Sequence, residues 1–150
     1  MDTERRKAEA VVALRAAGCR ITPQRLAIIQ VVLTDSGHPT ADQVFRQVRQ
    51  SYPTTSLATI YKTLDLMETL GLLLEIDMPT GARFDGYRSG AHAHLICDRC
   101  ERVIDLDAPE LNGLAERLAT QTGHRVDQNE MVFRGVCRLC LGSDHREVNR

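Results

Sequence analysis

Two cysteine pairs constrain this chain more than any other feature of its sequence. Cys97 and Cys100 form one Cys-x-x-Cys motif, Cys137 and Cys140 form a second, and 36 residues lie between them. A gap of two residues lets both thiolates of a pair face one point, and two such pairs complete a tetrahedron around Zn²⁺ with bonds of about 2.3 Å. Four thiolates leave no open coordination position, which favours a structural zinc ion over a catalytic one.

The cysteines also have other interpretations. The alternatives are a redox role for one pair and four unrelated buried thiols, but chance seldom yields two such pairs in 150 residues. Cys19 stands alone just after a predicted helix end, and we interpret it as a small half-buried residue rather than a reactive thiol. In a cytosolic chain this pattern indicates metal ligation instead of disulfides.

Composition and charge place the chain among globular proteins, with 43% hydrophobic and 26% charged residues. No apolar run approaches the roughly 18 residues of a membrane span, and the charged N-terminus lacks the apolar core of a signal peptide. We therefore expect a cytoplasmic protein with no membrane partner. The net charge is −1, with ten cations and ten acids in residues 1–85, so any contact with nucleic acid requires a local patch.

The first half of the chain reads as helices with capping or terminating residues at their ends. The predicted helices cover residues 4–17, 23–36, 41–52 and 56–70. A β-hairpin follows, with strands at residues 72–76 and 83–85 around a Pro79-Thr80-Gly81 turn. Helices followed by a hairpin favour a winged helix-turn-helix, in which residues 56–70 form the recognition helix and the hairpin forms the wing.

The second half changes pattern after a small polar connector at residues 86–91, which we interpret as a hinge. Three strands are predicted at residues 92–97, 103–106 and 126–133, with a helix marked by Leu111, Leu114 and Leu118 and ended by Gly123. Such a unit buries little core alone, so zinc and dimerisation are expected to supply stability. The predicted fold class is α+β: a winged helix-turn-helix domain over residues 1–85, then a small α/β dimerisation and zinc domain over residues 92–150.

Histidines and carboxylates form a second candidate site. His92 and His94 are two residues apart on a predicted strand, so both project from one face. Asp105 lies on the next predicted strand, Asp85 ends the wing, and His38 lies in the loop before the third helix. Nitrogen and oxygen donors without sulfur suit Fe²⁺, Mn²⁺ or Zn²⁺. Taken singly, each of these residues fits an ordinary surface or structural side chain better than it fits a metal ligand.

Polar residues near two predicted helix starts are candidates for DNA contact. The first group would reach base edges in the major groove, and the second would bind phosphates and set the register. The groups are Ser56, Thr59, Tyr61 and Lys62 for the groove and Arg20, Gln24 and Arg25 for the phosphates. The alternatives are core packing for Tyr61 and solvated surface charge for the arginines.

Together these motifs resemble the ferric uptake regulator (Fur) family along roughly residues 10–141. The matching stretches are residues 20–25, 38–42, 58–64, 71–72, 83–85, 92–97 and 135–137. The resemblance implies a metal-dependent transcription repressor that binds a double-stranded inverted-repeat operator as a homodimer. It also implies structural Zn²⁺ on the four cysteines. The regulatory Fe²⁺ or Mn²⁺ that it implies would be held by His38, Asp85, His92, His94 and Asp105.

Within that family the chain looks closest to the peroxide-responsive (PerR) branch. Iron-responsive members more often carry glutamate where this chain has Asp85, and many members carry a histidine where it has Asn129. In the peroxide-responsive branch, Fe²⁺ reacts with hydrogen peroxide and a ligand histidine is oxidised; the matching residues are His38 and His92. The connector between Asp85 and His92 is one residue longer than is typical, so it must bulge if Asp85 is to ligate.

Other functions stay open from the sequence. One is a repressor that responds to iron, zinc or manganese without peroxide chemistry. Another is a non-haem metal enzyme that uses the histidines and carboxylates around an open position, and a third is a zinc-stabilised protein adaptor. We expect no enzyme, because an enzyme does not need the capped helices and wing of residues 22–85.

Overall fold

The computed structural model describes residues 3–86, 92–111, 113–126 and 131–147. The chain divides into two compact units, residues 1–89 (unit 1) and residues 90–150 (unit 2). Within the described residues, no helix combines the length and the apolar character that crossing a membrane requires.

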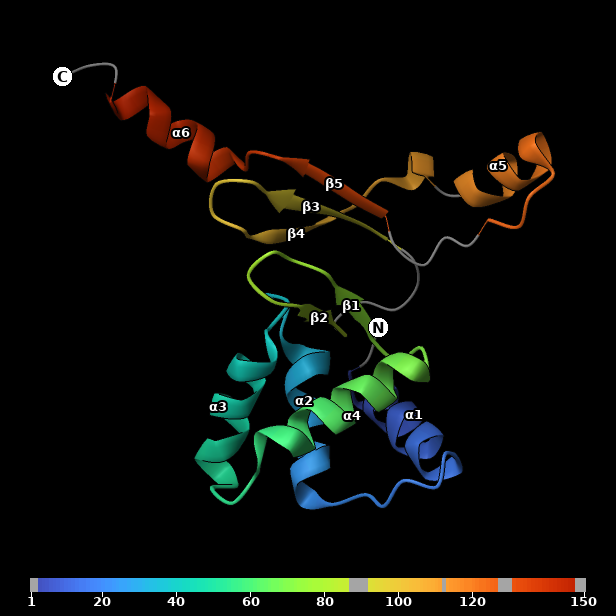
Figure 1. Ribbon diagram of the computed structural model, residues 1–150, viewed down its shortest axis with the longest axis vertical. Helices are drawn as coiled ribbons and strands as arrows, with labels where there is room; N and C mark the ends of the chain where they lie inside the picture. The colour runs from blue at the N-terminus through green and yellow to red at the C-terminus, as the bar shows by residue number, and fades with distance from the viewer. Residues whose placement is uncertain (1–2, 87–91, 112, 127–130, 148–150) are drawn as a thin grey trace. The chain divides into compact units, whose positions relative to one another are not determined.

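Four helices make up most of unit 1 (Figure 1). They are α1 (Thr3–Ala16), α2 (Pro23–Thr34), α3 (Ala41–Ser51) and α4 (Leu57–Thr69). The side chains of Thr22, Thr40 and Ser56 each accept a hydrogen bond from the backbone N–H three residues later, at the starts of α2, α3 and α4. These caps satisfy N–H groups that a first helical turn leaves unpaired. All three helices begin where the sequence predicts them.

The helices and the wing share one apolar core. Leu14 of α1, Ile28 of α2, Val44 of α3, Leu64 of α4 and Phe84 of the wing are all at most 2% exposed. Burial of a side chain of this size contributes about 1.5–3 kcal/mol. The core therefore fixes the face that α4 presents to solvent.

The wing is a two-stranded antiparallel hairpin of β1 (Leu74–Ile76) and β2 (Arg83–Asp85). Leu74 lies opposite Asp85 in the register. The turn contains Gly81 at a φ of 113°, a backbone conformation that glycine adopts readily. An isolated bridge between Arg83 and Thr40 ties β2 to the start of α3, so the wing is attached to the loop that precedes α3.

Unit 2 contains a three-stranded sheet in the order β4-β3-β5. The strands are β3 (Ala93–Cys97), β4 (Val103–Leu106) and β5 (Met131–Gly135). β3 pairs antiparallel with β4, where His94 lies opposite Asp105, and parallel with β5, where Cys97 lies opposite Gly135. Because β3 and β5 run in the same direction, both cysteine motifs emerge at the same end of the sheet.

The remaining elements of unit 2 are the 3₁₀ turn η1 (Pro109–Leu111), α5 (Leu114–Thr122) and α6 (Arg138–Glu147). Unit 2 differs from the sequence prediction in three places, the first of which is α6, a helix that was not predicted. Leu111 belongs to η1 and not to the predicted helix, since Gly113 adopts a φ of 69° directly before α5. The last strand runs through Gly135, whereas residues 127–130 of the predicted strand lie outside the described residues.

Candidate functional site

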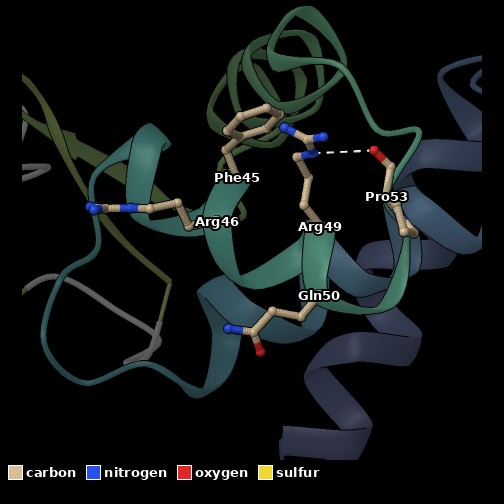
Figure 2. A pocket seen from close by; sticks show the side chains of 5 residues that line it. All are labelled: Phe45, Arg46, Arg49, Gln50 and Pro53. Atoms are coloured by element: carbon tan, nitrogen blue, oxygen red, sulfur yellow. Dashed lines mark hydrogen bonds between the residues drawn. The ribbon is translucent and has the colours of Figure 1, made fainter.

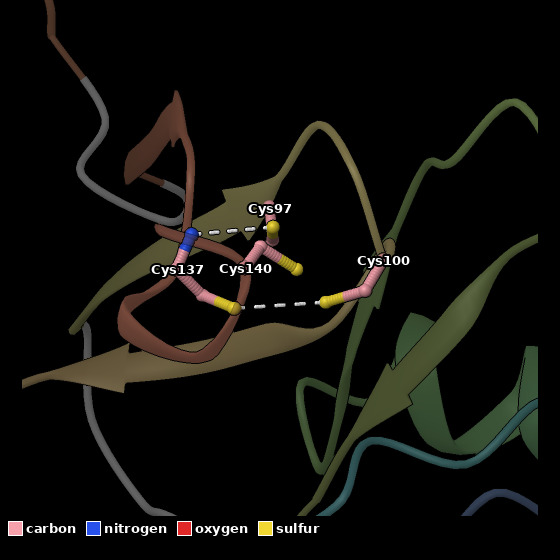
Figure 3. Close-up of side chains that lie close together, drawn as sticks. All are labelled: Cys97, Cys100, Cys137 and Cys140. Carbon is pink, nitrogen blue, oxygen red and sulfur yellow. Dashed lines mark hydrogen bonds between the residues drawn. The ribbon is translucent and has the colours of Figure 1, made fainter. Parts of the chain in front are cut away.

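The four cysteines of the two motifs converge in unit 2 (Figure 3). Their sulfur atoms all lie within 4.8 Å of one another, and the Sγ atoms of Cys100 and Cys137 are 3.7 Å apart. Four bonds of about 2.3 Å at tetrahedral angles would place sulfur atoms about 3.8 Å apart. The quartet therefore has the dimensions and the donor chemistry of a tetrahedral zinc site.

Backbone hydrogen bonds hold both cysteine motifs in tight turns. The N–H of Cys97 donates to the carbonyl of Arg102 at 3.0 Å, and the N–H of Glu101 donates to the carbonyl of Cys97 at 2.8 Å. In the second motif, the N–H of Leu141 donates to the carbonyl of Cys137 at 3.0 Å. The N–H of Cys137 donates to the Sγ atom of Cys97 at 3.2 Å, so the two motifs are also joined directly.

The clustered thiols change one another's ionisation. Hydrogen bonds from the backbone, first of all from Cys137, lower the pKa of Cys97 to about 6 because they favour its thiolate. Hydrogen bonds with the side chains of Cys137 and Cys100 raise the pKa of Cys140 to about 12. A backbone hydrogen bond from Cys140 also lowers the pKa of Cys137. Full ionisation of the quartet requires a cation among the sulfur atoms.

A second cluster joins two histidines and an aspartate within unit 2. The Oδ1 atom of Asp105 lies 3.5 Å from Nε2 of His92 and 3.6 Å from Nε2 of His94. The two imidazole centroids are 4.5 Å apart. This geometry follows from the pairing of β3 with β4, which sets His94 opposite Asp105. Two imidazole nitrogens and one carboxylate oxygen form a donor set suited to Fe²⁺, Mn²⁺ or Zn²⁺.

Unit 1 places His38 beside Asp85, with 3.9 Å between Nε2 and Oδ1, and buries both residues. His38 has a φ of 55°, a left-handed conformation that costs a non-glycine residue roughly 1–3 kcal/mol. The Arg83 guanidinium donates to the carbonyl of His38 at 3.2 Å, and the N–H of Phe84 donates to the carbonyl of Pro39 at 3.0 Å. The strand β2 therefore holds this strained loop in place.

Arg6 of α1 is a neighbour of this pair that the sequence analysis missed. Its buried guanidinium donates to the carbonyl of Gly86, the residue after Asp85. Burial lowers the pKa of Arg6, and the nearby Asp85 carboxylate opposes that shift. A signal was present in the sequence, because Arg6 lies on the same helical face as the buried Ala10 and Leu14. A cation in an apolar stripe indicates a specific partner.

The residues expected to contact base edges lie on and just before α4. Tyr61 is 46% exposed and Lys62 is also exposed, so the alternative of core packing for Tyr61 is wrong. Ser56 is exposed and Thr59 is half-buried, and their hydroxyl oxygens are 2.9 Å apart. Ser56 also caps α4, so it has a structural role whatever else it contacts.

The residues expected to contact phosphates lie at the start of α2. Arg20 is exposed, whereas Gln24 and Arg25 are half-buried. The Arg25 guanidinium donates to the carbonyl of Arg20, and the N–H of Arg25 donates to the Thr22 side chain. The first of these hydrogen bonds holds the Arg25 side chain against the backbone of Arg20.

Cations gather in two stretches of unit 1 that contain no acidic residue. Residues 10–34 and residues 43–64 contain no aspartate or glutamate. Their cations are Arg15, Arg20, Arg25, Arg46, Arg49 and Lys62. The net charge of −1 therefore conceals a local excess of positive charge on the segments that contain α2, α3 after Asp42, and the start of α4. A patch of this kind attracts a polyanion such as nucleic acid.

Known proteins resemble the chain over most of its length. A model of the Ferric uptake regulator family matches residues 16–134. Peroxide-responsive repressor PerR of Staphylococcus aureus (strain USA300) is 37% identical over 134 residues, which is 88% of this chain and 89% of the relative. The Campylobacter jejuni peroxide stress regulator is 28% identical and matches 87% of this chain and 98% of its own, with a TM-score of 0.71. The Helicobacter pylori ferric uptake regulator Fur, at 18% identity, shares the fold with a TM-score of 0.79 over 94% of this chain and 95% of its own.

Proposed function

We propose that this chain, which belongs to the ferric uptake regulator family and is a metal-dependent repressor, senses hydrogen peroxide through oxidation of its own metal-ligating histidines. The observation that carries the proposal is the buried pair of His38 and Asp85, with 3.9 Å between nitrogen and oxygen. An aspartate at this position and the 37% identity to a peroxide-responsive repressor both support peroxide sensing over a response to metal supply alone.

Zinc has a structural role in this proposal. The four sulfur atoms fit a tetrahedral Zn²⁺ in size, and together they leave no coordination position for a substrate. The ion would join the turn after β3 to the start of α6, and so stabilise a unit with a small apolar core.

The regulatory ion, Fe²⁺ or Mn²⁺, would take ligands from both units. Unit 2 would contribute His92, His94 and Asp105, and unit 1 would contribute His38 and Asp85. An ion held in this way stabilises one arrangement of the two units over all others. A preference of roughly 10⁴-fold for that arrangement would switch the protein almost completely.

The residues around the proposed ion have separate tasks. Bound Fe²⁺ would supply the redox chemistry that activates hydrogen peroxide toward the nearby imidazoles. In the net reaction, one peroxide molecule adds one oxygen atom to an imidazole carbon of His38 or His92 and leaves as water, so two electrons pass from the ring to the peroxide. Asp105, whose Oδ1 atom lies 3.5 Å from Nε2 of His92 and 3.6 Å from Nε2 of His94, would share the ion with these two imidazoles. The strand β2 holds His38 through Arg83. An oxidised ring would be a poorer ligand, so the DNA-binding arrangement would lose its support.

The proposed partner is a double-stranded DNA inverted repeat, bound by a homodimer in the cytoplasm. The acid-free stretches of unit 1 support an attraction to DNA, and the exposed Tyr61 and Lys62 on α4 support contact with base edges. Arg20, Gln24 and Arg25 would bind phosphates. For the dimer, Val132 and Phe133 of β5 are 37% and 43% exposed, and because successive side chains of a strand lie on opposite faces, each face offers one apolar side chain to a second protomer. The family and the relatives are described as regulators, and we propose no enzymatic activity.

The test is DNA binding before and after a brief exposure to hydrogen peroxide. The probe is an inverted-repeat duplex selected from a random pool by the Mn²⁺-loaded protein. The Fe²⁺-loaded protein is expected to lose binding after peroxide and not to regain it with fresh Fe²⁺, whereas the Mn²⁺-loaded protein keeps binding. If the Fe²⁺-loaded protein still binds DNA after peroxide, the result would favour a repressor that reports metal supply. Binding that persists unchanged in EDTA would exclude the metal switch.

A further inference from the structure

We propose that Arg46 and Arg49 of α3 each bind a phosphate of the DNA backbone beside the half-site that α4 reads. This inference rests on the proposed DNA binding and extends it to residues that the sequence analysis did not select. The two arginines line a surface pocket of about 320 Å³ together with Phe45, Gln50 and Pro53 (Figure 2).

Arg49 is held in position before any ligand arrives. Its guanidinium carbon lies 5.2 Å from the centroid of the Phe45 ring, within the range of a cation–π interaction. Its Nε–H donates to the carbonyl of Pro53 at 3.1 Å, as the dashed line in Figure 2 shows. These contacts use the face of the guanidinium and one N–H, so the two terminal amino groups keep their donors for a ligand. A planar guanidinium that is already oriented loses little freedom when it binds a phosphate.

Arg46 adds a second cation one helical turn from Gln50, on the exposed side of α3. Its Nε–H donates to the carbonyl of Asp42 at 3.4 Å, so it too is joined to the backbone through one N–H. Within the described residues, no carboxylate forms an ion pair with Arg46 or Arg49. Residues 43–64 contain no acidic residue, and Asp42 in the first turn of α3 directly precedes them.

The position of the pocket along the chain selects a backbone phosphate as the ligand. Pro53, which Arg49 holds, lies three residues before Ser56, the N-cap of α4. Both arginines therefore lie on α3, the first helix of the helix-turn-helix, and Pro53 lies on the turn that leads into the recognition helix. In that motif the first helix crosses the DNA backbone while the second enters the major groove. The pocket is open and shallow enough for a phosphodiester that stays attached to its duplex.

The salt dependence of DNA binding tests this assignment. Affinity for the selected duplex is measured by fluorescence anisotropy at several salt concentrations, with Mn²⁺-loaded full-length protein. The slope of log K against log salt is negative, and each lost phosphate contact reduces its magnitude by about 0.9. Two arginines in each of two protomers make four contacts, so Arg46→Gln/Arg49→Gln should reduce the magnitude of the slope by about 3–4. Binding to a scrambled duplex should weaken by the same factor, because phosphates carry no sequence information.

Two variants make the result specific to this pocket. Arg5→Gln removes the same charge from an arginine that is 67% exposed and paired with Glu9, and it should leave the slope unchanged. Arg46→Lys/Arg49→Lys keeps both charges and should restore most of the slope. A wild-type slope in the Arg46→Gln/Arg49→Gln protein would overturn the inference and leave the proposed function intact. Failure of the wild-type protein to bind any duplex would overturn both.

A free anion is the other source of the same chemistry. Inorganic phosphate is therefore titrated into DNA-free protein at constant ionic strength, with wild type and Arg46→Gln/Arg49→Gln compared. Phosphate binding that the substitution abolishes, together with an unchanged salt slope for DNA, would assign the pocket to a free anion and refute the contact with the DNA backbone.

Discussion

Substitution of Cys97 by serine is expected to unfold unit 2 and to leave unit 1 folded. Cys97 is completely buried, and its sulfur accepts a hydrogen bond from the N–H of Cys137 at 3.2 Å. A serine oxygen is a poor replacement for a thiolate in a zinc site, since it stays protonated near neutral pH. The quartet would then lose both its ion and the link between its two motifs.

The size of the expected loss of stability follows from how the buried hydrophobic side chains are divided between unit 1 and unit 2. Among the described residues, 17 of the buried hydrophobic side chains belong to unit 1 and only five to unit 2, two of which are the cysteines Cys97 and Cys137. Ile96 and Val103 are the largest of the other three, and together they contribute about 3–6 kcal/mol. Binding of structural zinc contributes about 10–16 kcal/mol in small zinc domains. The ion is therefore expected to dominate the stability of unit 2.

Hydrogen exchange read by mass spectrometry distinguishes the two units in one experiment. In Cys97→Ser, amides of β3, β4 and β5 should exchange as in an unfolded chain, while amides of α2 and α4 keep wild-type protection. Elemental analysis should show loss of about one zinc per chain. Cys19→Ser is the matched control, because Cys19 is half-buried in unit 1 and outside the quartet. Wild-type protection of unit 2 in a zinc-free Cys97→Ser protein would refute the reasoning.

Three further substitutions test unit 1 by urea unfolding. In Gly86→Ala the new Cβ would lie 2.7 Å from Val32 Cγ1 and 3.0 Å from the Val32 carbonyl oxygen. It should lower the free energy of unfolding by about 1–3 kcal/mol, and an unchanged midpoint would mean that this segment moves freely. Thr40→Ala removes the capping box with Gln43 and should cost about 1 kcal/mol, while Thr40→Ser should cost less. Arg6→Met keeps an apolar stem but removes the donor to the Gly86 carbonyl, and should cost about 1–3 kcal/mol. Wild-type stability of Arg6→Met would show that this carbonyl finds another donor.

Local signals in the sequence predicted the helical part of the fold well. Thr22, Thr40 and Ser56 cap α2, α3 and α4 as expected, because an N-cap acts within four residues and depends little on the rest of the molecule. The convergence of Cys97 with Cys137 was also predictable, since thiolates at this spacing indicate a shared ion.

Features that depend on tertiary context were not predicted. The helix α6 begins at Arg138, directly after Cys137, and contains Gly142. It has neither a capping residue nor an apolar stripe from which the sequence could predict a helix. The parallel pairing of β3 with β5 joins segments far apart in the chain, and alternation of side chains does not reveal a strand's partner. The burial of Arg6 likewise depends on the Gly86 carbonyl, about eighty positions away.

Peptide mass spectrometry of the Fe²⁺-loaded protein, before and after a brief dose of hydrogen peroxide, tests peroxide sensing most directly. We predict one added oxygen atom on the peptide that carries His38 or on the peptide that carries His92. The addition should be absent when Mn²⁺ replaces Fe²⁺. Unmodified histidines in a peroxide-treated protein that still binds DNA with Fe²⁺ would contradict peroxide sensing and would show that the protein reports metal supply.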